Sequence, residues 1–141
     1  MKIIVLAGGL STERDVSLSS AAGICRTLLE KGHDAYLLDV FLGLESPPEH
    51  LEDVFTLPGH GLEIARNIGT EEPDLEAVRA SRPDQSDCFL GPNVIELCRM
   101  ADITFLGLHG GEGENGKLQA TFDLLGIRYT GPDSLGCAVA M

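Results

Sequence analysis

The stretch "KIIVLAGG", Lys2 to Gly9, decides the fold class, because a β-branched, apolar run without alternation is typical of a strand covered on both faces. The two glycines end this strand. Apolar or small residues then recur at helical spacing from Leu18, and Gly32 is the expected C-terminal cap of that helix. "DAYLLDV", Asp34 to Val40, follows as a second strand. The start of the chain therefore predicts a β-α-β unit.

The second half of the chain repeats this alternation of strands and helices. We expect a helix over Pro92 to Ala101, a strand over Asp102 to His109, a helix over Lys117 to Gly126 and a strand over Ile127 to Gly131. The pattern predicts an α/β fold, a Rossmann-like three-layer domain with a mostly parallel sheet of about four strands. Residues 41–87 show no clear pattern, and a structureless loop of that length is unusual, so we expect an insertion at the rim of the sheet with some local strand or helix.

Length and charge limit the possible functions. A chain of 141 residues is long enough for one domain with a hydrophobic core. Its net charge of -12 opposes binding to nucleic acid or to an anionic membrane, which leaves small molecules or proteins as expected partners. The apolar run after Met1 is too short for a signal peptide or a membrane span, so we expect a cytoplasmic protein. The four cysteines are scattered and suggest neither a disulfide framework nor a structural metal site.

Ligands of open parallel sheets bind at the carboxyl ends of the strands, where this sequence has two unusual loops. The first is "AGGLSTERDVS", in which Thr12-x-x-Asp15 has the form of a capping box and places Glu13 in the first helical turn. The glycines do not match the dinucleotide-binding pattern, and a glutamate at a helix N-terminus repels phosphate. The structural alternative is an ordinary capped turn, in which the two carboxylates complement the helix dipole.

The second loop is "FLGLHGGEGENG", Phe105 to Gly116, in which His109 ends a strand and is followed by closely spaced glycines and carboxylates. Glycines spaced this closely indicate that a ligand approaches the backbone, because each glycine costs conformational entropy on folding and a purely structural turn needs fewer of them. Carboxylates at the same edge suit a cation, either a metal ion or an ammonium group. A metal site built from His109, Glu112, Glu114 and Glu13 is an alternative, although its spacing matches no strong ligand motif, and His109 by itself could be a hydrogen-bonded histidine at a strand end.

Three stretches in order, "VLAGGLSTERDVSLSSA", "LGLHGGEGENGKLQ" and "YTGPDSLGCAVAM", resemble the N-terminal domain of D-alanine-D-alanine ligases. That family has a G-G-x-S-x-E-x-x-V-S loop, an H-G-x-x-G-E-[DN]-G loop and a Y-T-G segment leading to methionine. The resemblance implies that residues 1–141 form a single pre-ATP-grasp domain, and that ATP-grasp domains follow Met141. ATP and Mg²⁺ would bind in those domains, so residues 1–141 by themselves are expected to be inactive and to bind no cofactor.

The resemblance also implies roles for particular residues. Glu13 corresponds to the catalytic and substrate-binding carboxylate that holds the ammonium of the first D-alanine, with Ser17 supporting it. His109 corresponds to the histidine that helps to position the carboxylate being activated. Gly110 and Gly111 bring the backbone close to the substrate, and Glu114 is expected to orient His109 or Glu13. No metal ligand is assigned, and Glu112 falls at a variable position.

The implied function is an ADP-forming D-alanine-D-alanine ligase, which joins two D-alanines through an acyl phosphate for peptidoglycan precursor synthesis. The implied partners are D-alanine, the ATP-grasp domains and a second copy in a homodimer. One alternative is a related ATP-grasp ligase that uses D-lactate or another amino acid. Another is a non-catalytic amino-acid-binding domain, and a flavodoxin-like carrier has little support because the first loop lacks a hydroxyl-rich phosphate cradle.

Overall fold

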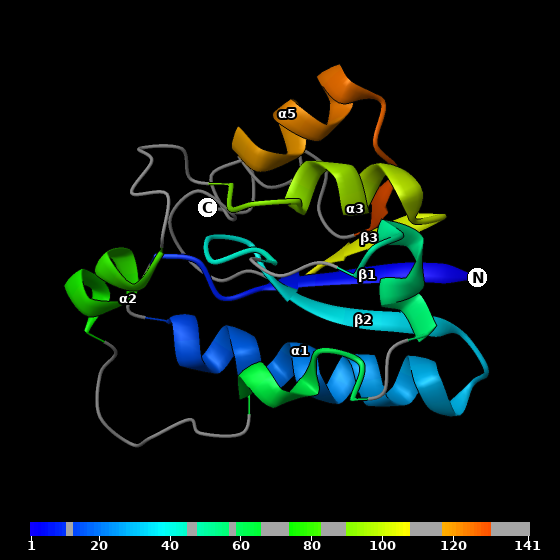
Figure 1. Cartoon of the computed structure of the whole chain (residues 1–141), viewed down its shortest axis with the longest axis horizontal. Helices are drawn as coiled ribbons and strands as arrows, with labels where there is room; N and C mark the ends of the chain where they lie inside the picture. The colour runs from blue at the N-terminus through cyan, green and yellow to red at the C-terminus, as the bar shows by residue number, and fades with distance from the viewer. Residues whose placement is uncertain are drawn as a thin grey trace.

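The chain folds around a parallel sheet with helices on both faces, and the computed structural model describes residues 1–10, 13–44, 48–56, 59–65, 74–82, 90–107 and 117–130 (Figure 1). The sheet has four strands in the order β2-β1-β3-β4, and each neighbouring pair is parallel. These strands are β1 (Lys2–Ala7), β2 (Asp34–Asp39), β3 (Ile103–Leu106) and β4 (Tyr129–Thr130). The predicted α/β class and the mostly parallel sheet are therefore confirmed.

The helix after the first strand, α1 (Arg14–Glu30), has Lys31 as its C-cap, and Gly32, which the sequence indicated as the cap, follows directly. Gly32 has a φ of +90°, which favours a residue without a Cβ. Its N–H donates to the Leu29 carbonyl at 3.0 Å, and the His33 N–H donates to the Leu28 carbonyl at 3.1 Å. This pair of bonds is a Schellman motif, which satisfies carbonyls at the end of the helix.

The sheet has a separate hydrophobic core on each face. Figure 1 shows α1 on one side of the sheet, with α3 (Val94–Met100) and α5 (Lys117–Leu125) on the other. Alternate residues of β1 point to opposite faces, so Ile3 and Val5 pack towards α1, whereas Ile4 and Leu6 pack towards α3 and α5. This burial on both sides explains why the strand reads as a continuous apolar run.

The insertion predicted at residues 41–87 contains helical segments, the 3-10 helices η1 (Leu51–Thr56) and η2 (Leu62–Ala65) and the α-helix α2 (Leu75–Ser81). It lies at the rim of the sheet, as expected. The His60 carbonyl accepts a hydrogen bond from the Leu37 N–H at 2.9 Å. Because β2 is the outer strand on this side, the bond covers part of an edge that would otherwise be open to pairing with another chain.

The two ends of the insertion are held beside the end of β2. Arg82, which follows α2, is 1% exposed, and its Nη1 donates to the Phe41 carbonyl at 3.0 Å. Its guanidinium also lies 4.4 Å from the centre of the Phe41 ring, in cation–π contact. Further along the chain, the Gly91 N–H donates to the Val40 carbonyl at 2.9 Å. The chain thus leaves and rejoins the sheet at the same place.

Some element boundaries differ from those that the sequence predicted. The helix expected from Pro92 begins at Val94, because Asn93 precedes it in the left-handed conformation, with a φ of +67°. The strand expected over Asp102 to His109 is limited to Ile103–Leu106 within the described residues. In the last strand, expected over Ile127 to Gly131, the described residues that form β4 are Tyr129–Thr130. The limits of the two strands are set by hydrogen bonding to a neighbouring strand, which a single sequence does not reveal.

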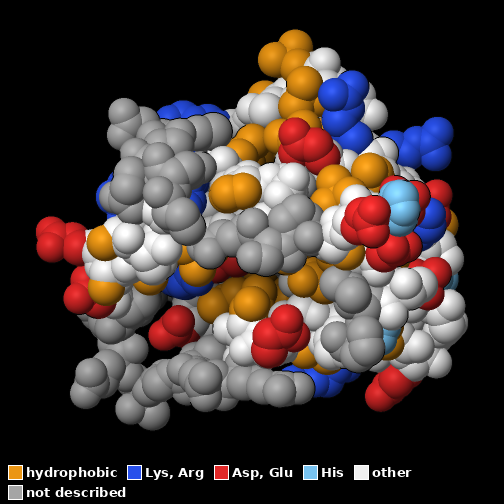
Figure 2. All heavy atoms as spheres, viewed as in Figure 1, with side chains coloured by type: hydrophobic (Ala, Val, Ile, Leu, Met, Phe, Trp, Pro, Cys, Tyr) orange, Lys and Arg blue, Asp and Glu red, His pale blue; other side chains and the backbone are white. Residues whose placement is uncertain are grey.

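Acidic side chains occur at several separate places on the face of the molecule shown in Figure 2, in keeping with the net charge of -12. Within the part of the chain that the structure describes, no helix is long and apolar enough to cross a membrane. A cytoplasmic location remains a prediction.

Two glycines with positive φ offer a matched test of the packing between the insertion and β2. Gly61 has a φ of +75°, and a Cβ there would collide with the Leu37 carbonyl oxygen, whereas a Cβ at Gly32 would meet nothing within 4 Å. We expect Gly32→Ala to lower the free energy of unfolding by about 1–2 kcal/mol, from the left-handed backbone alone. Gly61→Ala should lower it by at least about 1 kcal/mol more, since backbone must also move. Urea denaturation measures both losses, and equal losses would contradict this close contact.

Candidate functional site

The carboxyl ends of β1 and β3 form the point at which the direction of the chain's connections reverses. From β1 the chain passes to β2 on one side, and β3 lies on the other side of β1. Open parallel sheets bind ligands in the crevice at such a reversal. The β1–α1 connection and Gly107, which directly follows β3, both lie here. The sequence predicted that its two unusual loops share this edge, and the described parts of both loops do so.

Ser17 joins three elements at this edge. Its side chain is fully buried, and its Oγ accepts a hydrogen bond from the Gly8 N–H at 3.0 Å. The same hydroxyl donates to the Gly107 carbonyl at 2.6 Å. One side chain of α1 therefore holds the end of β1 and the end of β3, and with them the starts of both loops. A buried backbone donor and a buried backbone acceptor are satisfied in the same step.

Glu13 lies at the N-cap position of α1, directly before the first helical residue. Its carbonyl accepts the Ser17 N–H at 2.9 Å, its side chain is exposed, and its carboxylate makes no capping hydrogen bond. The prediction that Glu13 lies in the first helical turn is thus wrong by one residue. Asp15 does lie in that turn, while Thr12, the expected cap, is outside the described residues. Both carboxylates stand at the start of α1, where they complement the helix dipole, so the alternative of an ordinary capped turn stays a prediction.

The other predicted site residues follow Gly107 and lie outside the described residues: His109, Gly110, Gly111, Glu112 and Glu114. Their roles stay predictions. What the structure adds is the anchoring of the residue that leads into them, since Gly107 is held by Ser17. Glu13 and Ser17 are brought together at one helix start, four residues apart and joined by a backbone hydrogen bond.

A buried ion pair beside Ser17 was not found from the sequence. Arg14, the first residue of α1, forms a salt bridge with Asp39 at the end of β2, and both side chains are buried. A signal for it exists in the sequence. A cation in the first turn of a helix opposes the helix dipole, so Arg14 needs an anion nearby. The choice among the many acidic residues depends on tertiary structure, because Asp39 is distant in the chain.

The described cysteines are not candidate nucleophiles. Burial raises the pKa of the Cys25 thiol to about 11, with a smaller opposing effect of Arg26, and raises that of Cys98 to about 12. Both side chains therefore stay protonated near neutral pH, and thiolate chemistry is excluded for them. Among the described residues, no group of three or more His, Cys, Asp or Glu side chains could hold a metal ion. The alternative metal site includes residues outside that set.

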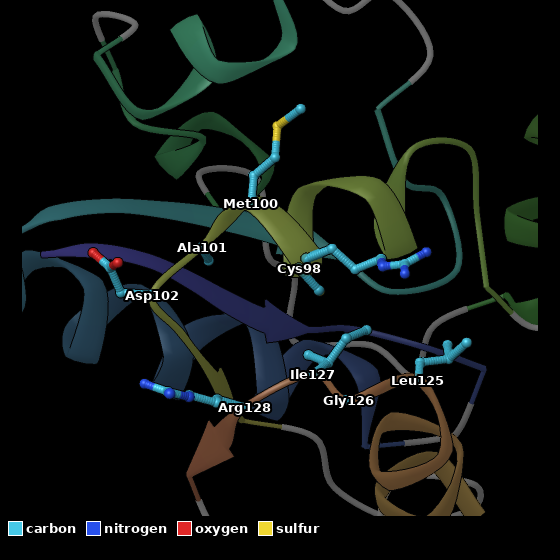
Figure 3. A pocket seen from close by; sticks show the side chains of 9 residues that line it. Cys98, Met100, Ala101, Asp102, Leu125, Gly126, Ile127 and Arg128 are labelled. Carbon is cyan, nitrogen blue, oxygen red and sulfur yellow. The ribbon is translucent and has the colours of Figure 1, made fainter.

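A hollow of about 460 Å³ lies at the opposite end of the sheet, where β3 and β4 begin (Figure 3). Its lining includes Asp102 and Arg128, of opposite charge, together with the ends of α3 and α5. Helix C-termini present carbonyl oxygens, which disfavour an anion beside the arginine. Figure 3 shows the side chains of Met100, Leu125 and Arg128 pointing in different directions. The lining groups do not converge on one ligand, and the carboxyl edge remains the candidate site.

The comparison with protein families agrees with this placement. The family model described as the D-ala D-ala ligase N-terminus matches residues 2–132. The chain belongs to this family. Its match covers the whole sheet, both loops and the insertion.

Relatives with known names are similar over the full chain. The D-alanine–D-alanine ligase of Lacticaseibacillus casei is 46% identical over all of this chain, which covers 39% of that protein. The corresponding ligase of Pediococcus pentosaceus is 48% identical, again over the whole chain and 40% of that protein. The crystal structure of VanG D-Ala:D-Ser ligase from Enterococcus faecalis matches with a TM-score of 0.56 and 25% identity, over 99% of this chain and 38% of that one. This chain thus spans about two fifths of the length of these two curated relatives.

The bridging role of Ser17 can be tested against a serine on the same helix. Ser17→Ala leaves the Gly8 N–H and the Gly107 carbonyl without the partner that they share, and we expect it to lower the free energy of unfolding by about 1–3 kcal/mol. The exposed Ser20 serves as the control, and Ser20→Ala should change it by less than about 0.5 kcal/mol. Denaturant unfolding gives both values. Similar values for the two variants would show that the hydroxyl bridge contributes little.

Proposed function

We propose that this domain forms the wall of the first amino-acid site in an ATP-dependent D-alanine–D-alanine ligase. The observation that carries the proposal is the position of the exposed Glu13 carboxylate, at the edge where the strand connections reverse. A carboxylate in that place suits the ammonium of an amino acid. Two relatives at 46% and 48% identity bear the ligase name. Since the chain spans about two fifths of their length, the activity is proposed for the full-length protein.

In this proposal, each residue of the edge has a separate part. Glu13 binds the ammonium of the first D-alanine and so orients it. Ser17 positions the two loops, since its hydroxyl is buried between their starting points. His109 lies beside the carboxylate to be activated, and Glu114 orients His109 or Glu13. Gly110 and Gly111 allow the backbone to approach the substrate closely.

The described residues do not suit a nucleotide. Glu13 stands at the start of α1, where an anion-binding helix N-terminus needs neutral or cationic neighbours. We therefore assign ATP and Mg²⁺ to ATP-grasp domains that follow residues 1–141, and expect these residues by themselves to be inactive. ATP supplies the phosphoryl group that activates the first carboxylate. The amine of the second D-alanine then displaces phosphate, and the dipeptide, ADP and phosphate are released.

A ligase with a different second substrate is the nearest alternative. VanG is a D-Ala:D-Ser ligase and shares the fold, but its identity of 25% is well below that of the two D-alanine–D-alanine ligases. The proposal therefore favours D-alanine for both substrates over D-serine, D-lactate or a purely binding domain. A homodimeric assembly, a cytoplasmic location and a role in peptidoglycan precursor synthesis belong to the same proposal.

The first test is the release of ADP by the full-length protein that contains these residues. We expect release to require D-alanine and to be lost with L-alanine, because the site orients an ammonium and a carboxylate about one chiral centre. A coupled assay with purified protein, ATP and Mg²⁺ measures it. No D-alanine-dependent release from a folded protein would reject the ligase proposal, and dependence on D-serine as well would favour the alternative substrate.

Substitution of Glu13 tests the ammonium site itself. Glu13→Gln keeps the size of the side chain but removes its charge, and a hydrogen bond to a charged group contributes about 1.5–3 kcal/mol, so we expect the KM of the first D-alanine to rise roughly tenfold or more. The KM of ATP should change little. Asp15→Asn is the matched control, since it removes a charge two residues further along, in the first turn of α1. Equal changes in both KM values, or equal effects of the two variants, would reject this role for Glu13.

A further inference from the structure

Arg14 is a buried cation at a place where a cation is unfavourable. It is the first residue of α1, and its side chain is 8% exposed. The N-terminal end of a helix carries a partial positive charge, so both the dipole and the loss of solvation act against this guanidinium. Such a residue needs strong compensation from its neighbours.

Asp39 and Gly9 supply that compensation. The Arg14 Nη2 forms the ion pair with the Asp39 Oδ2, and its Nη1 donates to the Gly9 carbonyl at 2.8 Å. The other carboxylate oxygen of Asp39 accepts from the N–H groups of Phe41 and Leu42, at 2.9 and 3.0 Å. The ion pair thus connects the β1–α1 loop to the turn that follows β2, and its hydrogen bonds satisfy both charged groups.

This network acts directly on the backbone around Glu13. The Arg14 side chain points into the protein and holds Gly9, while Glu13 next to it is exposed. Glu13 is the N-cap residue bonded directly to Arg14, so anchoring Arg14 fixes the peptide at the start of α1 and with it the direction in which the Glu13 side chain leaves the backbone. The Glu13 carbonyl is held in addition by the Ser17 N–H at 2.9 Å. The loop between Gly9 and Glu13 is therefore fastened at both ends.

We propose that Arg14 and Asp39 are a positioning pair that sets the direction of Glu13 towards the first amino acid. The pair does not touch the substrate. It acts by fixing the carbonyl of Gly9 and the first turn of α1 relative to the end of β2. This role rests on the proposed function of Glu13, but the fastening of the loop can be measured without any activity.

The tight fit at Gly8 supports this role. Gly8 has a φ of +80°, and a Cβ there would lie 2.7 Å from the Oδ2 of Asp39. The backbone of the β1–α1 loop is thus in close contact with the same carboxylate oxygen that binds Arg14. Asp39 itself is held in place from the other side, because the Phe41 carbonyl, in the turn that Asp39 caps, accepts a hydrogen bond from Arg82. The carboxylate has little room to move, as a positioning role requires.

A purely structural salt bridge is the competing explanation, and substitutions that remove only one of the two charges do not separate the two explanations. Removing one partner leaves the other as a buried, unpaired charge, which is strongly destabilising. The double variant Arg14→Met/Asp39→Asn removes both charges together. The new asparagine keeps an oxygen for the N–H groups of Phe41 and Leu42, and the new methionine fills the space of the arginine stem, but the bond to the Gly9 carbonyl is lost. The double variant should therefore be more stable than a variant that leaves one buried charge unpaired, while the amides of the β1–α1 loop should still exchange faster than in the wild type.

The experiment compares the full-length protein with this double variant, with Arg14→Lys, and with Arg26→Met as a control from the exposed side of α1. Hydrogen–deuterium exchange reports the amides of residues 8–13, thermal unfolding reports stability, and kinetics report the KM of D-alanine and of ATP. We expect the double variant to exchange about tenfold faster in residues 8–13, with exchange in β1 unchanged. The KM of the first D-alanine should rise about tenfold or more, with that of ATP unchanged.

In Arg14→Lys, the exchange rate of residues 8–13 and the KM of D-alanine should lie between those of the wild type and the double variant. The reason is that one ammonium replaces a guanidinium that reaches two acceptors. Arg26→Met should match the wild type. Wild-type exchange in residues 8–13 of a stable double variant would overturn the proposal, and so would faster exchange with an unchanged KM of D-alanine. If the double variant does not fold, Arg14→Lys decides by the same two measurements. If the wild-type protein releases no ADP with D-alanine, the function proposed above is rejected, but the exchange measurement still tests the fastening of the loop. Exchange in residues 8–13 of the double variant at the wild-type rate would overturn that fastening.

Discussion

The hydroxyl of Ser17 is the contact through which the helix, the two central strands and both loops are related to each other. It accepts from Gly8 and donates to Gly107, and it does so from a position without solvent exposure. A parallel sheet leaves the ends of its strands with unpaired backbone groups, and these must find partners if they are buried. Here one short side chain supplies both partners. The ends of β1 and β3 are consequently held at a fixed distance from the start of α1.

The buried charges beside Ser17 extend this arrangement across the sheet edge. Arg14 and Asp39 join the start of α1 to the end of β2, and Arg82 joins the end of the insertion to the turn after β2. Each of these cations is almost completely removed from solvent, which is unfavourable unless the charges are paired and hydrogen-bonded. Buried charges of this kind are stable only when their partners are held in one arrangement, and they lie at the carboxyl edge, where the candidate site needs a fixed backbone. A flexible carboxylate at Glu13 would lose part of its binding energy in becoming ordered.

Much of the fold could be predicted because burial leaves a direct record in the sequence. The continuous apolar run of β1 records a strand covered on both faces, and Gly32 records the left-handed residue that ends α1. The structure of the insertion at residues 41–87 could not be predicted in the same way. Its contacts with the sheet run through backbone groups, such as the bond between Leu37 and His60, and backbone groups are the same in every residue. Of the candidate site, Glu13 and Ser17 could be named from the resemblance, but Asp39 could not.

The sequence by itself determined the α/β class, the order of the main elements and the family, because periodic burial and special backbone angles restrict which residues can stand at each position. It also determined that a carboxylate follows the first strand. Tertiary structure alone decided that Arg14 pairs with Asp39 and that Ser17 lies between Gly8 and Gly107. Both are contacts between residues far apart in the chain, and which of many similar groups meet depends on how the strands are ordered in the sheet.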